Sequence, residues 1–433
     1  MKNKITHKNI RTPLVPLLLV MSAVGNAAEY DASVRAGVGA SDNIARTPQN
    51  EIAETITTAG FDFAVTEQTR RMDLDLRSQF EYLDYSDGTF DSEWVGGLNL
   101  FANFTLIDER LRWIVQNNFG QTLSDPFRPV GPDNRENVNF FTTGPTLNLL
   151  PASRNLVDID LRYSRINYEV RPYDNKRLSG ALSIGREISQ ESELSLNLRG
   201  QRTEFDDGEL TPPIELYEAF VRFETTGNRS TLGFDIGYTE VEFDGSEGDG
   251  ILARVDYTRQ TSANGTFTMS GGSQYSDQGN IFRFYNELTN NLGVTTDTTD
   301  SPAPFRNDFF ALAYTLDQVR YTVDASMDWN QENYDDGQGD DRDLFRGRLE
   351  FRREVTRTVF LGANIGFQRR EFKYLARRDD DLILGFNIGY RFSAGFDISI
   401  DYQHFQRNSI TPDADFTENR AFLRVSYMPV WSR

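Results

Sequence analysis

The chain of 433 residues contains no cysteine and only two histidines. Without cysteine, neither a disulfide framework nor a thiolate metal site can form. Beyond the first 27 residues there is no run of 18 apolar residues, so no membrane-spanning helix is predicted. Long Pro-rich, Gly/Ser-rich and single-sign charged tracts are also absent, which removes the usual linkers between domains. These absences favour one large repetitive architecture.

Catalytic and metal-binding patterns are equally scarce. His7 lies in the basic N-terminal segment, and His404 lies near an expected strand end, where a rim residue is favoured over a catalytic base. The acidic stretches "DDGQGDD" and "DGSEGDG" carry the oxygen ligands that calcium prefers, but they lack the spacing of an EF-hand. The sequence therefore predicts no catalytic residues, no metal site and no cofactor.

Positive charge is in short supply, with 45 Lys and Arg residues against 65 Asp and Glu residues and a net charge of −20. Such acidity argues against nucleic acid as a partner. The N-terminal stretch is an exception, because "MKNKITHKNIR" is basic and is followed by the apolar "PLVPLLLVMSAVG" and the small residues "GNAA". This pattern predicts a secretory signal peptide over residues 1–27. Residues 28–433 then form a single domain.

The remaining chain consists of short segments in which apolar and polar residues alternate. In Val157–Val170, the odd positions begin Val157, Ile159, Leu161, Tyr163, and the even positions begin Asp158, Asp160, Arg162, Ser164. Alternation with a period of two is typical of a β-strand with one apolar and one polar face. The same pattern recurs about twenty times. In one segment, Pro145 cannot donate to a ladder and predicts a local irregularity.

The connections between these segments alternate between short and long. Short turns such as "PASRN" and "SAG" alternate with long loops such as "SDPFRPVGPDNREN", "DGSEGDG" and "NSITPDADFTE". Short turns at one end and long loops at the other are typical of outer-membrane barrels. The prediction is an all-β fold, a transmembrane antiparallel up-and-down β-barrel of about 20 strands, with 18 to 22 as the range.

The polar face of this barrel is unusually ionic. The positions predicted to line the lumen are Asp73, Asp75, Arg77, Asp158, Asp160, Arg162, Arg199, Arg346, Arg348, Glu350, Arg352, Asp397 and Asp401. Acidic and basic side chains on neighbouring strands can pair along the barrel wall. Two interpretations stay open: a lining that only holds the barrel shape, and a conduit for a hydrophilic or charged solute.

Aromatic residues and one long connection complete the pattern. An aromatic girdle at the membrane interfaces is predicted from Trp94, Trp113, Trp329, Tyr427 and Trp431. The connection Gly279–Phe305 is far longer than its neighbours and contains an amphipathic stretch, Ile281–Leu288. Either it is a surface loop, or it folds into the lumen as a constriction. The candidate constriction residues are Ile281, Arg283, Tyr285 and Leu288.

Both ends of the chain carry resemblances to known proteins. The last segment, "NRAFLRVSYMPVWSR", resembles the C-terminal strand that the barrel insertion machinery recognises, although Ser432 and Arg433 follow the final aromatic residue. The opening "EYDASVRAGVGASDNIARTP" resembles porin-like Gram-negative outer-membrane barrels from exopolysaccharide and protein-sorting loci. This resemblance implies the outer membrane, with its lipid and insertion machinery as partners, and polysaccharide secretion or envelope biogenesis as the role.

Three functional hypotheses follow. The first is a non-enzymatic, porin-like barrel that conducts exopolysaccharide or another hydrophilic solute. The second is a structural or adhesive barrel with a closed lumen and acidic surface loops. The third, which the scarcity of histidine disfavours, is a barrel hydrolase that uses His404.

Overall fold

The structure is a computed structural model that describes residues 28–208, 211–289, 295–334, 341–392, 395–411 and 413–429. The expected signal peptide, residues 1–27, lies outside the described residues. No helix in these described ranges is long and apolar enough to cross a membrane.

Twenty strands and one helix make up the described chain. The strands are β1 (Glu29–Ser41), β2 (Glu54–Gln68), β3 (Met72–Tyr85), β4 (Glu93–Ile107), β5 (Leu111–Leu123), β6 (Arg135–Asn148), β7 (Asn155–Tyr168), β8 (Asn175–Glu187), β9 (Ser192–Phe205), β10 (Ile214–Thr226), β11 (Ser230–Phe243), β12 (Ser246–Ser262), β13 (Gly265–Ser276), β14 (Phe305–Gln318), β15 (Tyr321–Tyr334), β16 (Arg342–Glu354), β17 (Val359–Phe372), β18 (Arg377–Arg391), β19 (Phe396–Ser409) and β20 (Phe416–Tyr427). The helix, α2 (Gln278–Thr289), lies between β13 and β14.

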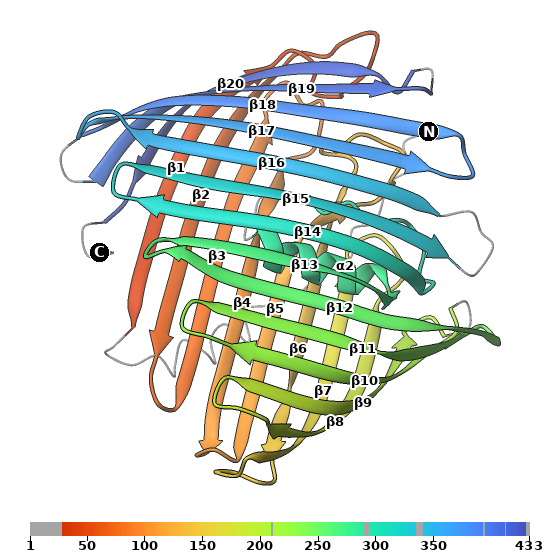
Figure 1. Cartoon of the computed structure of the whole chain (residues 1–433). Helices are drawn as coiled ribbons and strands as arrows, with labels where there is room; N and C mark the ends of the chain where they lie inside the picture. The colour runs from red at the N-terminus through yellow and green to blue at the C-terminus, as the bar shows by residue number, and fades with distance from the viewer. Residues whose placement is uncertain are drawn as a thin grey trace.

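Each strand pairs antiparallel with the strands before and after it, and the sheet closes on itself (Figure 1). Closure occurs where β1 pairs with β20, from Val34 opposite Tyr427 to Ser41 opposite Arg420. A closed sheet leaves no unpaired edge, which a β-structure in lipid requires. The prediction of a 20-stranded up-and-down barrel is confirmed.

Two local features refine the expected connections. Pro145 interrupts the ladder as predicted, because the β6–β7 pairing skips residues 144 and 145 and then continues in the same register. The expected long loop "DGSEGDG" is wrong, since β11 and β12 continue through it to a turn at Asp244 and Gly245. Both turn residues have positive φ, 53° and 73°, as the type I′ hairpin turn requires.

The two faces of the barrel wall follow the alternation in the sequence. On β7, the side chains of Leu161 and Tyr163 point outward and are 51% and 45% exposed. Asp160 and Arg162 point to the opposite, lumenal side, where they form an ion pair with 2.7 Å between Arg162 Nη2 and Asp160 Oδ1. The outward surface is therefore apolar and the lumen is polar, as a barrel in lipid requires.

The three described tryptophans, Trp94, Trp113 and Trp329, lie on the outward surface. Trp94, near the long-loop end of β4, is exposed and stacks with Tyr82 of β3. Trp113, near the short-turn end of β5, and Trp329 of β15 are also exposed. Tyr427 ends β20, and Trp431 lies outside the described residues. A role for this set as an interfacial girdle stays a prediction.

The face assignment leads to a stability prediction. Leu161→Arg places a charge in the hydrocarbon region and is expected to cost about 2–4 kcal/mol near the bilayer midplane. Asp160→Asn, on the lumenal face of the same strand, is the control and is expected to fold normally. Folding yields in lipid vesicles, read from the heat-dependent shift in gel mobility, measure both. A normal folding yield for Leu161→Arg would mean that Leu161 does not face lipid.

Candidate functional site: the lumen and its insert

The connection between β13 and β14, residues 277–304, is called the lumen insert below, and its described parts, residues 277–289 and 295–304, lie in the barrel lumen. Its first part is α2, which Asp277 caps: the Asp277 carboxylate accepts a hydrogen bond from the Asn280 backbone N–H at 3.1 Å. The same carboxylate receives two hydrogen bonds from Arg177 of β8, at 2.8 and 3.0 Å. The helix is thus anchored at its N-terminus to the wall formed by the first half of the chain.

Neighbouring side chains of α2 pack against two different walls of the barrel. Phe282 is buried in a cluster with Val138, Phe140, Ile166 and Tyr168 of β6 and β7. Ile281 and Tyr285 are buried in a second cluster with Ala303, Phe305 and Tyr334 at β14 and β15. The helix therefore bridges the lumen, as Figure 1 shows between the two walls.

Three of the four predicted constriction residues have described side chains. Ile281 and Tyr285 are buried in the second cluster, and the Arg283 guanidinium lies 5.3 Å from the Phe140 ring centroid. Tyr285 Oη donates to Asp328 Oδ2 at 3.0 Å. The Leu288 side chain lies outside the described part of the chain. The structure thus places these residues in the lumen, and their role as a constriction stays a prediction.

The return segment of the insert, residues 295–304, pairs with the far wall. Thr296 forms an isolated parallel bridge with Thr122 at the end of β5. Its N–H donates to the Gln121 carbonyl at 2.8 Å, and its carbonyl accepts from the Thr122 hydroxyl at 2.9 Å. Farther along, Arg171 donates to the Thr299 carbonyl at 2.7 Å. Backbone pairing of this kind fixes the segment across the lumen rather than above it.

Asp297 attaches the return segment to the opposite wall. Its carboxylate lies 2.6 Å from Arg342 Nη1 of β16 and 3.2 Å from Arg370 Nη1 of β17. Gln368 donates a further hydrogen bond at 2.5 Å. Burial alone would raise the pKa of Asp297, but the guanidinium groups of Arg370 and Arg342 outweigh it and hold the pKa below its usual value.

Asp297 is one member of a buried ladder of alternating charges, called the charge ladder below. In order along the wall from β15 to β19 it consists of Glu332, Arg342, Asp297, Arg370, Asp381 and Arg407. Arg342 and Arg370 are fully buried, and Arg407 is 1% exposed. Buried guanidinium groups need carboxylate partners within ion-pair distance, and Asp297 is the partner carboxylate that belongs to the insert.

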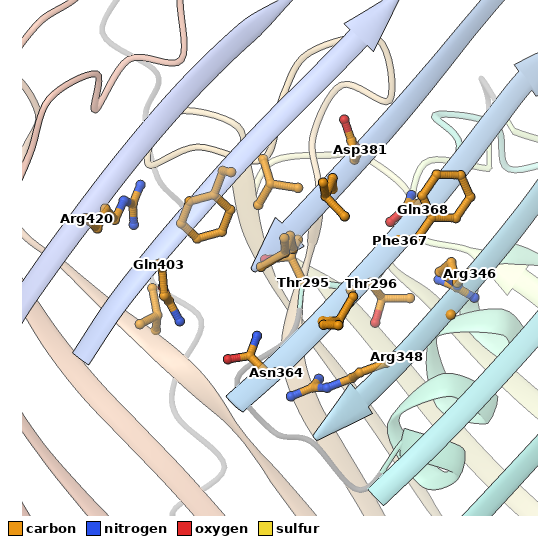
Figure 2. Close-up of a pocket in the computed structure, with 18 of the residues that line it drawn as sticks. Thr295, Thr296, Arg346, Arg348, Asn364, Phe367, Gln368, Asp381, Gln403 and Arg420 are labelled. Carbon is orange, nitrogen blue, oxygen red and sulfur yellow. The ribbon is translucent and has the colours of Figure 1, made fainter. Parts of the chain in front are cut away.

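A cavity of about 780 Å³ lies beside the insert. Nine arginines and three carboxylates are among its lining residues, and the arginines include Arg46, Arg346, Arg348, Arg352, Arg407 and Arg420. Figure 2 shows Thr295 and Thr296 of the insert in the middle of the view, with Arg420 to the left and Arg346 and Arg348 to the right. Cations therefore outnumber carboxylates three to one in the lining, although the whole chain is acidic.

The predicted lumen-lining residues are distributed over several regions of the wall. Arg346, Arg348 and Arg352 line the cavity, and Arg348 pairs with Glu350. Asp73, Asp75 and Arg77 lie on the same face of β3 as Glu81, which lines the cavity, but nearer the short-turn end. Asp158, Asp160 and Arg162 lie on the lumenal face of β7, Arg199 lies 3.5 Å from Glu218 of β10, and Asp397 and Asp401 pair with Arg391 and Arg424. Their role in transport stays a prediction.

Sequence reasoning missed the charge ladder. Arg342, Arg370 and Arg407 lie at the long-loop ends of their strands, where the alternation merges into loop sequence. Asp297 lies in the Thr-rich "TTDTTDS", which does not have the alternation of apolar and polar residues that marks the strands. The excess of arginine at the long-loop ends of the last five strands is the one signal that could have indicated it.

His404 has no catalytic surroundings among the described residues. Its Nδ1 lies 2.8 Å from Asn419 Oδ1, which also accepts from the Tyr402 hydroxyl at 2.7 Å. Tyr402 points to the outward face, and His404 lies two residues farther along the same strand. No cluster of three or more His, Cys, Asp or Glu residues with metal-binding geometry occurs in the described ranges.

The closed sheet, polar lumen and apolar outer surface define a porin-like β-barrel. Residues 343–428, from β16 to the end of β20, match the family model described as "Putative beta-barrel porin 2". No curated protein matches the chain.

Solved structures that resemble the chain include receptors and transporters. A mutant of the ferric enterobactin receptor PfeA from Pseudomonas aeruginosa has a TM-score of 0.47 and 7% identity over 94% of this chain and 81% of its own. The siderophore receptor PirA from Acinetobacter baumannii has a TM-score of 0.44 and 9% identity, with the same coverage. The copper transporter OprC has a TM-score of 0.42 and 11% identity over 93% of this chain and 80% of its own.

Proposed function

We propose that the protein is a non-enzymatic conduit of the Gram-negative outer membrane for a hydrophilic solute, with the lumen insert as its constriction. The observation that carries this proposal is the insert itself: it bridges the polar lumen by contacts to both walls and leaves an arginine-lined cavity of about 780 Å³ beside it. A barrel that served only as a membrane anchor would need neither an insert across its lumen nor a cavity beside it. The resemblance of Glu29–Pro48 to barrels from exopolysaccharide loci favours a saccharide as the solute.

The second candidate is a structural barrel with a permanently closed lumen. The observation that favours it is the dense bonding of the insert, in which the Thr296 backbone and the Asp297 carboxylate attach to opposite walls. The acidic loops at the long-loop end would then be the surface that binds partners. The two candidates differ in whether a solute crosses the barrel.

Proteoliposome swelling separates the two candidates. Vesicles that contain the purified barrel are expected to swell in arabinose faster than empty vesicles, and to swell still faster when the insert is replaced by a short turn. The shift in gel mobility on heating serves as the control that both proteins are folded. If neither protein admits arabinose while both are folded, the conduit is wrong and the structural barrel is the better function.

A further inference from the structure

We propose that the arginine-lined cavity binds an acidic saccharide, that is, a chain of sugar units that carry carboxylate groups. The proposal rests on the conduit proposed above, because it names the chemical class of the solute. It stands on three observations: how the charges are layered around the cavity, which donors lack partners, and which neutral groups lie between the arginines.

The first observation is that carboxylates near the cavity are shared between arginines. Glu418 is fully buried and is the partner of both Arg46, at 2.8 Å, and Arg420. Glu81 lies 3.7 Å from Arg35 and 3.7 Å from Arg424. Arg46, Arg420, Arg35 and Arg424 all line the cavity, whereas Glu418 lies behind them in the wall. Around Glu418, anything inside the cavity therefore meets guanidinium groups first, and the carboxylates that do line the cavity, those of Glu81, Asp328 and Asp381, each have an arginine partner.

The second observation is that several arginines of the cavity have N–H groups without a hydrogen-bond acceptor among the described residues. Arg407 is 1% exposed, yet its Nη1 has no hydrogen-bond partner among the described residues, and the same holds for Arg346 Nη2 and Arg424 Nε. Arg352 forms no ion pair within the described ranges and lies 4.2 Å from the Phe360 ring centroid. Buried polar atoms are usually satisfied, so open donors around one cavity indicate an acceptor that enters it.

The third observation is the neutral lining. Asn364, Gln403, Gln406 and Asn387 lie among the arginines, and Asn387 Oδ1 has no hydrogen-bond partner in the described part of the chain. A side-chain amide offers both a donor and an acceptor, which suits sugar hydroxyl groups. Guanidinium groups recognise carboxylates by paired, charge-assisted hydrogen bonds. The two kinds of side chain together fit a ligand that has both hydroxyl and carboxylate groups.

The size and position of the cavity agree with this ligand. A volume of about 780 Å³ falls within the range of roughly 300–1,000 Å³ that is typical of small-molecule sites. Tyr285 and Asn286 of the insert form part of its wall, so a bound saccharide would contact the segment that bridges the lumen. A metal cation, by contrast, would meet nine arginines and three carboxylates.

Equilibrium binding to the folded barrel in detergent tests the proposal without any need for conduction. The probes are an oligogalacturonate, an uncharged maltooligosaccharide of equal length and inorganic phosphate, each titrated by calorimetry. We expect the oligogalacturonate to bind most tightly and its affinity to fall as salt rises, because exposed charges are screened. Equal binding of the two saccharides, absence of oligogalacturonate binding, or equally tight binding of phosphate would overturn the proposal.

A pair of matched variants locates the site. Arg352→Gln removes a cation that leaves no carboxylate behind and is expected to weaken oligogalacturonate binding about tenfold, as loss of a charge-assisted hydrogen bond does. Arg222→Gln is the control: Arg222 belongs to β10, does not line the cavity, and its partner Asp235 keeps Arg254 at 2.9 Å. Equal losses in both folded variants would contradict the assignment to this cavity.

Failure of the acidic-saccharide proposal can be distinguished from failure of the conduit proposal. Arabinose entry without oligogalacturonate binding would leave the conduit intact and remove the acidic saccharide. The opposite result is that Arg352→Gln weakens oligogalacturonate binding while the barrel admits no arabinose, with or without its insert. This result would support the binding site and contradict the conduit.

Discussion

Replacement of residues 277–304 by an Asn-Gly turn is expected to raise the single-channel conductance of the barrel several-fold. Ser276 and Phe305 already lie opposite each other in the β13–β14 ladder, so a two-residue turn can join them without a change of register. Asn-Gly is the dipeptide that such a hairpin prefers. The replacement removes the helix that bridges the lumen and leaves all twenty strands in place.

The barrel is expected to tolerate this change because the arginines of β16 and β17 keep carboxylate partners, and among the described residues only Arg177 loses its carboxylate partner, Asp277. Without Asp297, Arg342 still lies 3.0 Å from Glu332, and Arg370 still pairs with Asp381. Water that enters the emptied lumen also lowers the cost of any charge left over. Apolar groups such as Val138 and Ile166 become exposed to the lumen, so some loss of thermal stability is expected, but no ladder hydrogen bond is lost.

Planar-bilayer recording of both proteins in the same lipid measures the effect. Exclusion of poly(ethylene glycol) of increasing size gives an independent reading, and larger polymers should enter the variant than enter the intact protein. Equal conductance and equal polymer exclusion in two folded proteins would show that the insert does not limit the passage. Silence of both would agree with the closed, structural barrel.

The parts of the structure that sequence reasoning predicted are those with a short-range signal. Each strand shows its two faces within a few residues, as Leu161 and Asp160 do, and each connection shows its length directly. The hairpin at Asp244 and Gly245 also had a local signal, the Asp-Gly dipeptide, but the acidic residues around it favoured a loop.

The interior of the barrel could not be predicted in the same way. Thr296 meets Thr122, and Asp297 meets Arg342 and Arg370, through contacts between residues far apart in the sequence. Such contacts depend on the curvature of the closed sheet, which brings the end of β5 and the ends of β16 and β17 to the same part of the lumen. No periodicity in the sequence of the insert predicts which strands its residues contact.

Asp297→Ala is expected to release the return segment of the insert from the wall. The substitution leaves the fully buried Arg342 and Arg370 with one carboxylate fewer, and removal of one partner from a buried ion pair typically costs about 3–5 kcal/mol. At about 1.4 kcal/mol per factor of ten, the equilibrium between docked and released insert shifts by roughly two to three orders of magnitude. Conductance should then fluctuate between the level of the intact protein and that of the Asn-Gly variant.

Asp300→Ala is the matched control, because Asp300 belongs to the same segment but is exposed and forms no ion pair within the described ranges. Hydrogen exchange at the Thr296 amide, which donates to the Gln121 carbonyl, reports docking directly. It should accelerate in Asp297→Ala and stay slow in Asp300→Ala. Equal exchange in both variants would mean that Asp297 does not hold the insert.

The pH dependence of docking separates the charge of Asp297 from its shape. The pKa of Asp297 in the folded barrel lies below its usual value, which is about 3.9 in unstructured peptides. A carboxylate with a lowered pKa stabilises the docked state fully above that usual value and loses its contribution only as the pH falls through the lowered one. Acidification to about pH 5 should therefore leave the protection of the Thr296 amide, relative to its intrinsic exchange rate at the same pH, and the conductance unchanged. Asp297→Asn, which keeps the shape but not the charge, should release the insert at neutral pH. Release of the insert in the unsubstituted protein at pH 5 would mean that another titratable group holds the insert.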